Sequence, residues 1–96
     1  MNSAEAQEIL SRELSQYRDW PYEQLRDLVS LPKGVSRVPG PSGVLYYVDI
    51  RVVWDSWWRG TVRVLGAIDD GSGLSPYVPL TDSFIKAPDE TFVGED

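Results

Sequence analysis

Apolar side chains recur every three or four residues through the first third of the chain, which is the spacing of one face of an α-helix. Residues 3–17 carry such a stripe, and Asn2 or Ser3 can cap the helix. Its apolar members are Ala6, Ile9, Leu10, Leu14 and Tyr17. A second stripe follows Pro21, which suits the first position of a helix, and stops at the LPKG of 31–34. Its members are Tyr22, Leu25, Leu28 and Val29.

From Leu45 onward the apolar period changes to two, which is typical of strands with one buried face. In the first run that face consists of Tyr46, Val48, Ile50, Val52 and Trp54, and in the next of Val62, Val64, Gly66 and Ile68. The faces coincide when Trp54 lies opposite Val62, since a slip of one residue would turn every side chain over. The same register pairs Val52 with Val64 and Val48 with Ile68. Residues 56–60, SWWRG, remain as a five-residue loop.

Shorter strands are predicted on both sides of this hairpin. Residues 35–38 form an edge strand before the PGPSG turn of 39–43, and DDGSG at 69–73 makes another turn. Residues 74–80 are expected at an edge, because Pro76 and Pro79 cannot donate ladder hydrogen bonds. The last segment, SFIKAPDETFVGED, predicts a short strand, a turn at PDE, another short strand and a frayed acidic tail at 94–96.

The fold class predicted from these elements is α+β. Two N-terminal helices pack on one face of an antiparallel β-meander of three to five strands. The length of 96 residues suits a single domain, 1–96, with a helical part at 1–32 and a sheet part at 35–93.

The amino-acid composition limits the reactions and metal sites that the chain can support. The chain contains no histidine and no cysteine, so it lacks the commonest general base, the commonest metal ligand and any thiolate. Serine–histidine and cysteine–histidine catalysis are therefore excluded. We expect no catalytic residues, no metal and no cofactor, and these features favour a non-enzymatic protein without deciding the question.

The net charge of −6 is unevenly distributed. Residues 1–32 carry six acidic and three basic side chains, residues 33–66 two and five, and residues 67–96 seven and one. An acidic chain lacks the basic footprint of a nucleic-acid binder. The first residues lack the basic and apolar regions of a signal peptide, and no apolar run reaches the length of a membrane span. These features predict a cytoplasmic protein with no nucleic-acid or membrane partner.

Three of the four tryptophans fall in the sequence WDSWWRG of 54–60. Trp54 is expected on the buried face near its rim, while at least one of Trp57 and Trp58 should be exposed in the loop. In a structural interpretation one loop indole folds over the sheet end and Arg59 stacks on the other as a cation–π pair. In a functional interpretation Trp57, Trp58 and Arg59 anchor a partner, because Trp and Arg dominate interface hot spots.

An alternative site is a small-molecule pocket or a weak hydrolase with aromatic walls and a carboxylate. Its candidate residues are Tyr46, Trp54, Asp55, Asp70 and Tyr77. The turn at 69–73 lacks the spacing of a calcium loop and has the composition of a tight turn. Asp69 and Asp70 are neighbours on a strand, so they point to opposite faces and would not address one substrate.

The other face of the predicted sheet mixes charged and apolar side chains. It consists of Tyr47, Asp49, Arg51, Val53, Asp55, Arg63, Leu65, Ala67 and Asp69. Arg63 is expected diagonal to both Asp55 and Arg51. The face is either solvated and held by weak ion pairs or it is a half-apolar docking or dimer surface.

Several motifs resemble those of a family of small uncharacterised bacterial proteins, a domain of unknown function. The matching positions are Gly43, Tyr46, Trp54-Asp55, Asp69-Asp70-Gly71, Pro79-Leu80, Phe84-Ile85, Ala87-Pro88-Asp89 and Phe92-Val93-Gly94-Glu95. The likeness covers about half of the chain and departs at Glu90, where the family favours glycine, which implies a different final turn. It implies a bacterial origin and an α+β fold, and adds no mechanism.

The function predicted from these features is a non-enzymatic protein-interaction module that uses an aromatic hairpin tip. Its partner would be another protein or a second copy of the chain.

Overall fold

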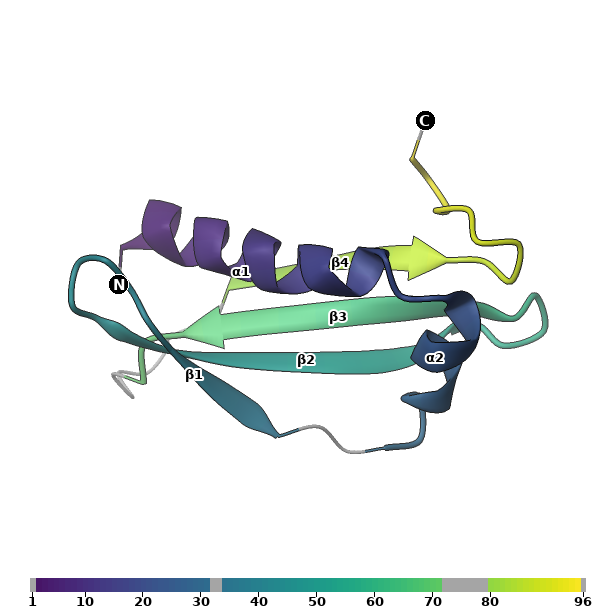
Figure 1. The fold of residues 1–96 in the computed structure, drawn as a ribbon, viewed down its shortest axis with the longest axis horizontal. Helices are drawn as coiled ribbons and strands as arrows, with labels where there is room; N and C mark the ends of the chain where they lie inside the picture. Colours follow the sequence, from purple (N-terminus) through teal and green to yellow (C-terminus); the bar gives the residue numbers. More distant parts are fainter. Residues whose placement is uncertain (1, 32–33, 72–79, 96) are drawn as a thin grey trace.

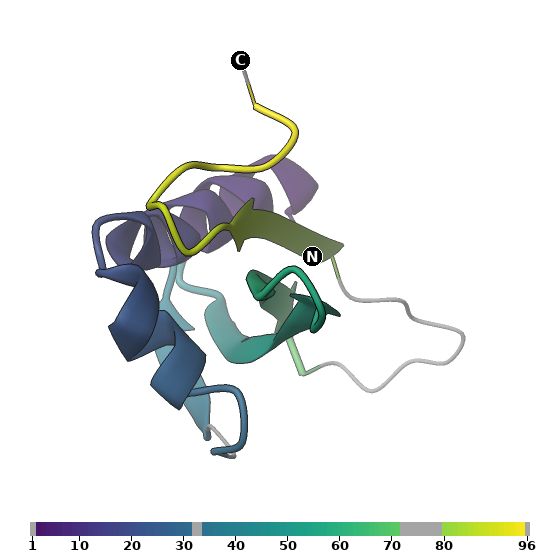
Figure 2. The ribbon, with the colours of Figure 1, turned by 90° about the vertical axis from the view of Figure 1, so that its right-hand side faces the viewer.

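The computed structural model describes residues 2–31, 34–71 and 80–95 (Figure 1). The order of elements is α1 (Ser3–Arg18), α2 (Tyr22–Asp27), β1 (Val35–Pro39), β2 (Leu45–Ser56), β3 (Thr61–Asp69) and β4 (Leu80–Lys86). The strands form one antiparallel sheet in the order β1-β2-β3-β4. Figure 2, which looks along the sheet from the hairpin end, shows both helices on one side of it. The predicted α+β meander is confirmed.

Helix α1 forms where the apolar stripe predicts it. The side chain of Asn2 caps it by accepting a hydrogen bond of 3.1 Å from the backbone N–H of Glu5. Helix α2 is shorter than the predicted second stripe, because it ends at Asp27 and the chain continues in turns. Neither helix, nor any other helical segment in the described part of the chain, is long and apolar enough to cross a membrane.

The register between β2 and β3 is the predicted one. Trp54 pairs with Val62, and the pairs of Val52 with Val64 and Val48 with Ile68 follow. A β-bulge at Asp55 then shifts the ladder so that Ser56 pairs with Thr61. The bulge takes up Asp55 as an extra residue on β2, so Ser56 joins the strand and the loop comprises the four residues 57–60 rather than the predicted five.

The C-terminal part of the sheet differs from the prediction. The predicted edge strand 74–80 lies outside the described residues except for Leu80, and the strand beside β3 is β4, in which Phe84 faces Val64. The second short strand expected after the PDE turn is reduced to an isolated bridge between Lys86 and Phe92.

The core lies between the helices and the apolar face of the sheet. Its buried apolar residues are Ala6, Ile9, Leu10, Leu14, Tyr22, Leu25, Tyr46, Val48, Ile50, Val52, Val62, Val64, Ile68 and Phe84. At Gly66 a side chain would have its Cβ 2.8 Å from Leu10 and 3.1 Å from Ile50, so glycine lets α1 approach β3 closely.

Candidate functional site

The hairpin between β2 and β3 ends in two exposed tryptophans. Trp57 and Trp58 are 77% and 68% exposed. The turn is closed by backbone hydrogen bonds from Arg59 N to Ser56 O (3.1 Å) and from Gly60 N to Trp57 O (3.2 Å), and Gly60 has φ +75°. The indoles therefore project from a tight, hydrogen-bonded turn.

Arg59 and Trp58 form the cation–π pair of the structural interpretation, since the guanidinium carbon lies 4.4 Å from the ring centroid. The other half of that interpretation is wrong, because neither indole folds over the end of the sheet. The stacked guanidinium leaves the Trp57 ring and most of the Trp58 ring open to solvent.

Two other parts of the chain hold the base of this loop. The hydroxyl of Tyr22, in the first turn of α2, donates a hydrogen bond to the carbonyl oxygen of Gly60. A Cβ on Gly60 would lie 3.2 Å from Cγ of Pro88, so the turn after β4 packs against the loop as well. Residues far apart in the sequence thus converge at the base of the hairpin.

Asp55 braces the hairpin from the side of the sheet away from the helices. Its carboxylate accepts hydrogen bonds from Thr61 Oγ1 (3.2 Å) and from Arg63 Nη2 (3.0 Å). Arg63 donates in turn to Ser83 Oγ at 2.9 Å, so three strands are linked below the turn. Arg63 lies diagonal to both Asp55 and Arg51, as predicted, and it pairs with Asp55, while Arg51 pairs with Asp49 at 2.9 Å.

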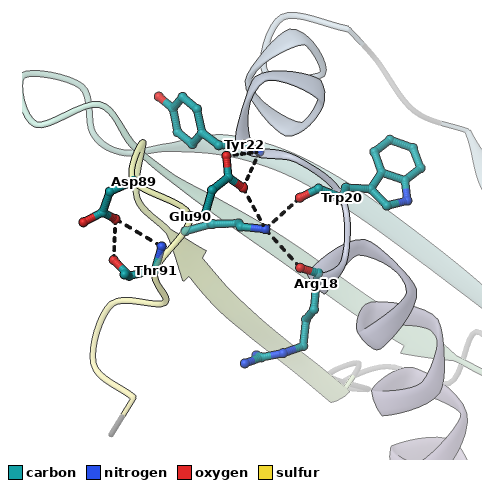
Figure 3. Close-up of polar contacts among 7 residues, drawn as sticks. Arg18, Trp20, Tyr22, Asp89, Glu90 and Thr91 are labelled. Carbon is teal, nitrogen blue, oxygen red and sulfur yellow. Dashed lines mark hydrogen bonds and ion pairs between the residues drawn. The ribbon is translucent and has the colours of Figure 1, made fainter.

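A buried lysine fastens the turn after β4 to the link between the helices (Figure 3). Lys86 is only 5% exposed, and its Nζ donates to the backbone oxygens of Arg18 (3.1 Å) and Trp20 (2.7 Å). It also lies 3.3 Å from Oε1 of Glu90. Glu90 accepts from the backbone N–H of Tyr22 at 3.0 Å, so its carboxylate caps the start of α2. We call these contacts the lysine cluster.

The backbone of Glu90 has φ +72°, the left-handed region in which glycine is most at ease. A glutamate therefore occupies a position of this turn that suits glycine, while the expectation of a different final turn, which depends on the resemblance, stays a prediction. Asp89 stabilises the same turn by accepting from Thr91 Oγ1 (2.5 Å) and Thr91 N (3.1 Å), and these hydrogen bonds lower the pKa of Asp89. These contacts are visible in Figure 3.

The C-terminal residues return to the end of α1. Arg18 makes a two-pronged contact with the carboxylate of Glu95, at 2.5 and 3.0 Å. The hydrogen bonds from Arg18, with its positive charge, lower the pKa of Glu95. The guanidinium carbon of Arg18 also lies 4.0 Å from the centroid of Phe92, so the segment after the turn is tied to the helix twice.

The four described residues of the alternative pocket do not gather at one place. Tyr46 is fully buried at the start of β2, and Trp54 lies eight residues along the same strand, about 26 Å away. Asp55 is at the Trp54 end and Asp70 follows β3 at the Tyr46 end. Tyr77 lies outside the described residues.

Trp54 is also less buried than predicted. Its side chain has the expected parity but is 42% exposed, whereas Val52 and Val62 beside it are 5% and 0% exposed. The core therefore covers Val62, which pairs with Trp54, but leaves part of the indole exposed. The consequence is that Trp54 adds a third partly exposed indole to the hairpin.

Asp69 stabilises the turn that follows β3, since its Oδ1 accepts a hydrogen bond of 2.7 Å from the backbone N–H of Gly71. Among residues 2–31, 34–71 and 80–95, no three acidic side chains gather in a way that could hold a metal ion.

A shallow depression of about 500 Å³ lies beside Asp69 on the sheet face away from the helices. Its lining residues are Val35, Arg37, Tyr47, Asp69 and Gly71, none of which belongs to the alternative pocket.

Comparison of the chain with models of protein families, with curated proteins and with solved structures found no match. The resemblance to the bacterial family stays a prediction that rests on its motifs. What defines the site is therefore its own geometry, a rigid hairpin with exposed indoles and a braced base.

Proposed function

We propose that the protein is a non-enzymatic interaction module of the bacterial cytoplasm, related to the family that its motifs resemble, and that Trp57, Trp58 and Arg59 anchor a partner protein. The observation that carries the proposal is the exposure of two adjacent indoles, 77% and 68%, on a turn that is held in place. Large exposed apolar side chains tend to mark interaction sites.

The support behind the turn favours an anchor over a loose loop. Binding is opposed by the entropy lost when mobile side chains and loops are ordered, and that loss is smaller for a turn that is already fixed. Gly60 is held by Tyr22 and packed by Pro88, and Asp55 braces the strand before the turn. The stacked Arg59 adds a charged donor beside the indoles, a combination enriched at binding hot spots.

The test is the double substitution Trp57→Ser/Trp58→Ser. Because both indoles are exposed, the melting temperature is expected to stay within a few degrees of the parent protein. Loss of aromatic anchors typically weakens binding by about 2 kcal/mol or more, roughly 30-fold in affinity. Immobilised parent and variant proteins are compared by quantitative mass spectrometry of what each captures from an extract of the source cells. A protein retained by the parent alone is the expected result.

The matched control is Leu31→Ser, which removes an apolar side chain that is 59% exposed outside the hairpin. This variant is expected to retain the captured protein. A fall in melting temperature of about ten degrees or more in the double variant, with capture unchanged, would make the tryptophans structural and refute the proposal.

A further inference from the structure

The sheet face opposite α1 and α2 has no described element packed against it. It consists of the odd-numbered positions of the four strands, and we call it the open face. Leu65 lies near its centre, between Arg51 on β2 and Ser83 on β4, and is 36% exposed. Val53 and Val35 are 38% and 58% exposed. The face thus presents accessible apolar side chains among polar and charged ones.

The charges of the open face cancel. Arg37, Arg51 and Arg63 balance Asp49, Asp55 and Asp69, so this face contributes nothing to the net charge of −6. Two of the arginines are already paired within the sheet, Arg51 with Asp49 at 2.9 Å and Arg63 with Asp55 at 3.0 Å. Charges that keep a partner within the same chain are less costly to cover than unpaired ones.

This distribution of charge indicates which partner the open face can bind. Two acidic molecules of net charge −6 repel each other over most orientations, but not when their neutral faces meet. A basic partner would instead be drawn to the acidic regions elsewhere on the chain. Because arginine and aspartate are equal in number on this face, contact between two copies of it brings together no excess of like charge.

The size of the face is sufficient for a dimer of modest affinity. Four strands about 4.8 Å apart, with ladders of about eight residues at about 3.3 Å each, give a flat footprint of about 500 Å². Protruding side chains make the accessible area larger than this footprint. The result approaches the roughly 800 Å² per partner that is usual for specific interfaces.

We infer that the open face is the interface of a homodimer, formed by face-to-face packing of two sheets around Leu65 and Val53. This dimer is independent of the hairpin anchor, because the tryptophans lie in the loop beyond the end of the sheet. Stacked sheets pack about 10 Å apart with interdigitated side chains, which suits the medium-sized residues of this face.

Sedimentation equilibrium of the parent protein tests the inference. The mass is expected to rise from 10.8 kDa toward twice that value with a dissociation constant on the order of 10–100 µM. Leu65→Glu places a carboxylate at the centre of both copies, and at least a 30-fold weakening is expected. Salt should not weaken the parent dimer, because it screens the repulsion between the two acidic molecules.

Two further variants distinguish a loss of dimerisation from a loss of folding and from an effect of the hairpin. Val53→Glu makes the same test at a second position if Leu65→Glu loses its fold in a dilute melt. Trp57→Ser/Trp58→Ser should dimerise like the parent, which separates this interface from the anchor. The inference is overturned if the parent stays at 10.8 kDa up to about 1 mM, if both glutamate variants fold and dimerise like the parent, or if only the tryptophan variant becomes monomeric.

Discussion

The hydroxyl of Tyr22 donates its hydrogen to the carbonyl oxygen of Gly60 and so joins the start of α2 to the tryptophan hairpin. The two residues are separated by 38 positions in the sequence. Tyr22 is 7% exposed, and its backbone N–H is capped by Glu90. Tyr22 therefore contacts the turn after β4 through its backbone N–H and the hairpin through its side-chain hydroxyl.

Removal of this hydroxyl tests the support directly. Tyr22→Phe keeps the ring in the core but leaves the Gly60 carbonyl without its donor, so a loss of about 0.5–1.5 kcal/mol in the free energy of unfolding is expected. Urea denaturation measures that loss. Faster amide exchange at Arg59 and Gly60 should accompany it, and unchanged exchange there would show that the hydroxyl does not hold the turn.

The assignment of Val64 to the buried face and of Arg51 to the open face predicts different losses of stability for their alanine variants. Val64 is fully buried opposite Phe84, and Val64→Ala should lower the free energy of unfolding by about 1–3 kcal/mol through lost burial and a residual cavity. Arg51 lies on the open face with its side chain 67% exposed, so Arg51→Ala should cost less than about 0.5 kcal/mol. Denaturant melts that rank Arg51→Ala as the more harmful change would contradict this assignment.

The lysine cluster provides a third test. Lys86→Met keeps the apolar stem but leaves the carbonyls of Arg18 and Trp20 without their charged donor, and a loss of about 2–3 kcal/mol is expected. Glu90→Gln should cost less than about 1 kcal/mol, since an amide oxygen still accepts from Tyr22 N and this side chain is largely exposed. Thermal and urea melts compare the two, and equal losses would show that the ion pair dominates instead.

Acid should remove the contribution that the contact between Glu95 and Arg18 makes to the stability of the fold. Hydrogen bonds from Arg18 lower its pKa below the ordinary value of 4.5, so the contact stabilises the fold above that pH. As the pH falls from 4.5 through the lower pKa of the folded state, the carboxylate is protonated and the benefit disappears. The melting temperatures of the parent and of Glu95→Gln should therefore differ at pH 7 and converge in strong acid. A difference that stays constant down to pH 2 would refute this account.

Much of the fold follows from local pattern. The alternation from Tyr46 to Trp54 and from Val62 to Ile68 determines which faces are apolar, and only one register brings those faces together. That register was predictable because each strand carries its own period. The depth of burial was not predictable, because Trp54 has the right parity yet is 42% exposed, while Val62 opposite it is fully buried.

The support behind the hairpin lay beyond sequence reasoning. Lys86 and Glu90 look like ordinary surface residues of a strand end and a turn, and their partners Trp20 and Tyr22 are more than 60 positions away. Such contacts depend on how α1, α2 and β4 meet, which no local period encodes. The sequence offered one signal at this turn, a glutamate where the resemblance predicts glycine, and the structure gives Glu90 a positive φ.

The placement of the tryptophans also makes the protein its own optical reporter. Trp54, Trp57 and Trp58 share one hairpin and are at least 42% exposed, while Trp20 lies half-buried beside Tyr17. Three of the four fluorophores are thus already in contact with water in the native state. Intrinsic emission should shift little to the red when the chain unfolds, but clearly to the blue when a partner covers the hairpin.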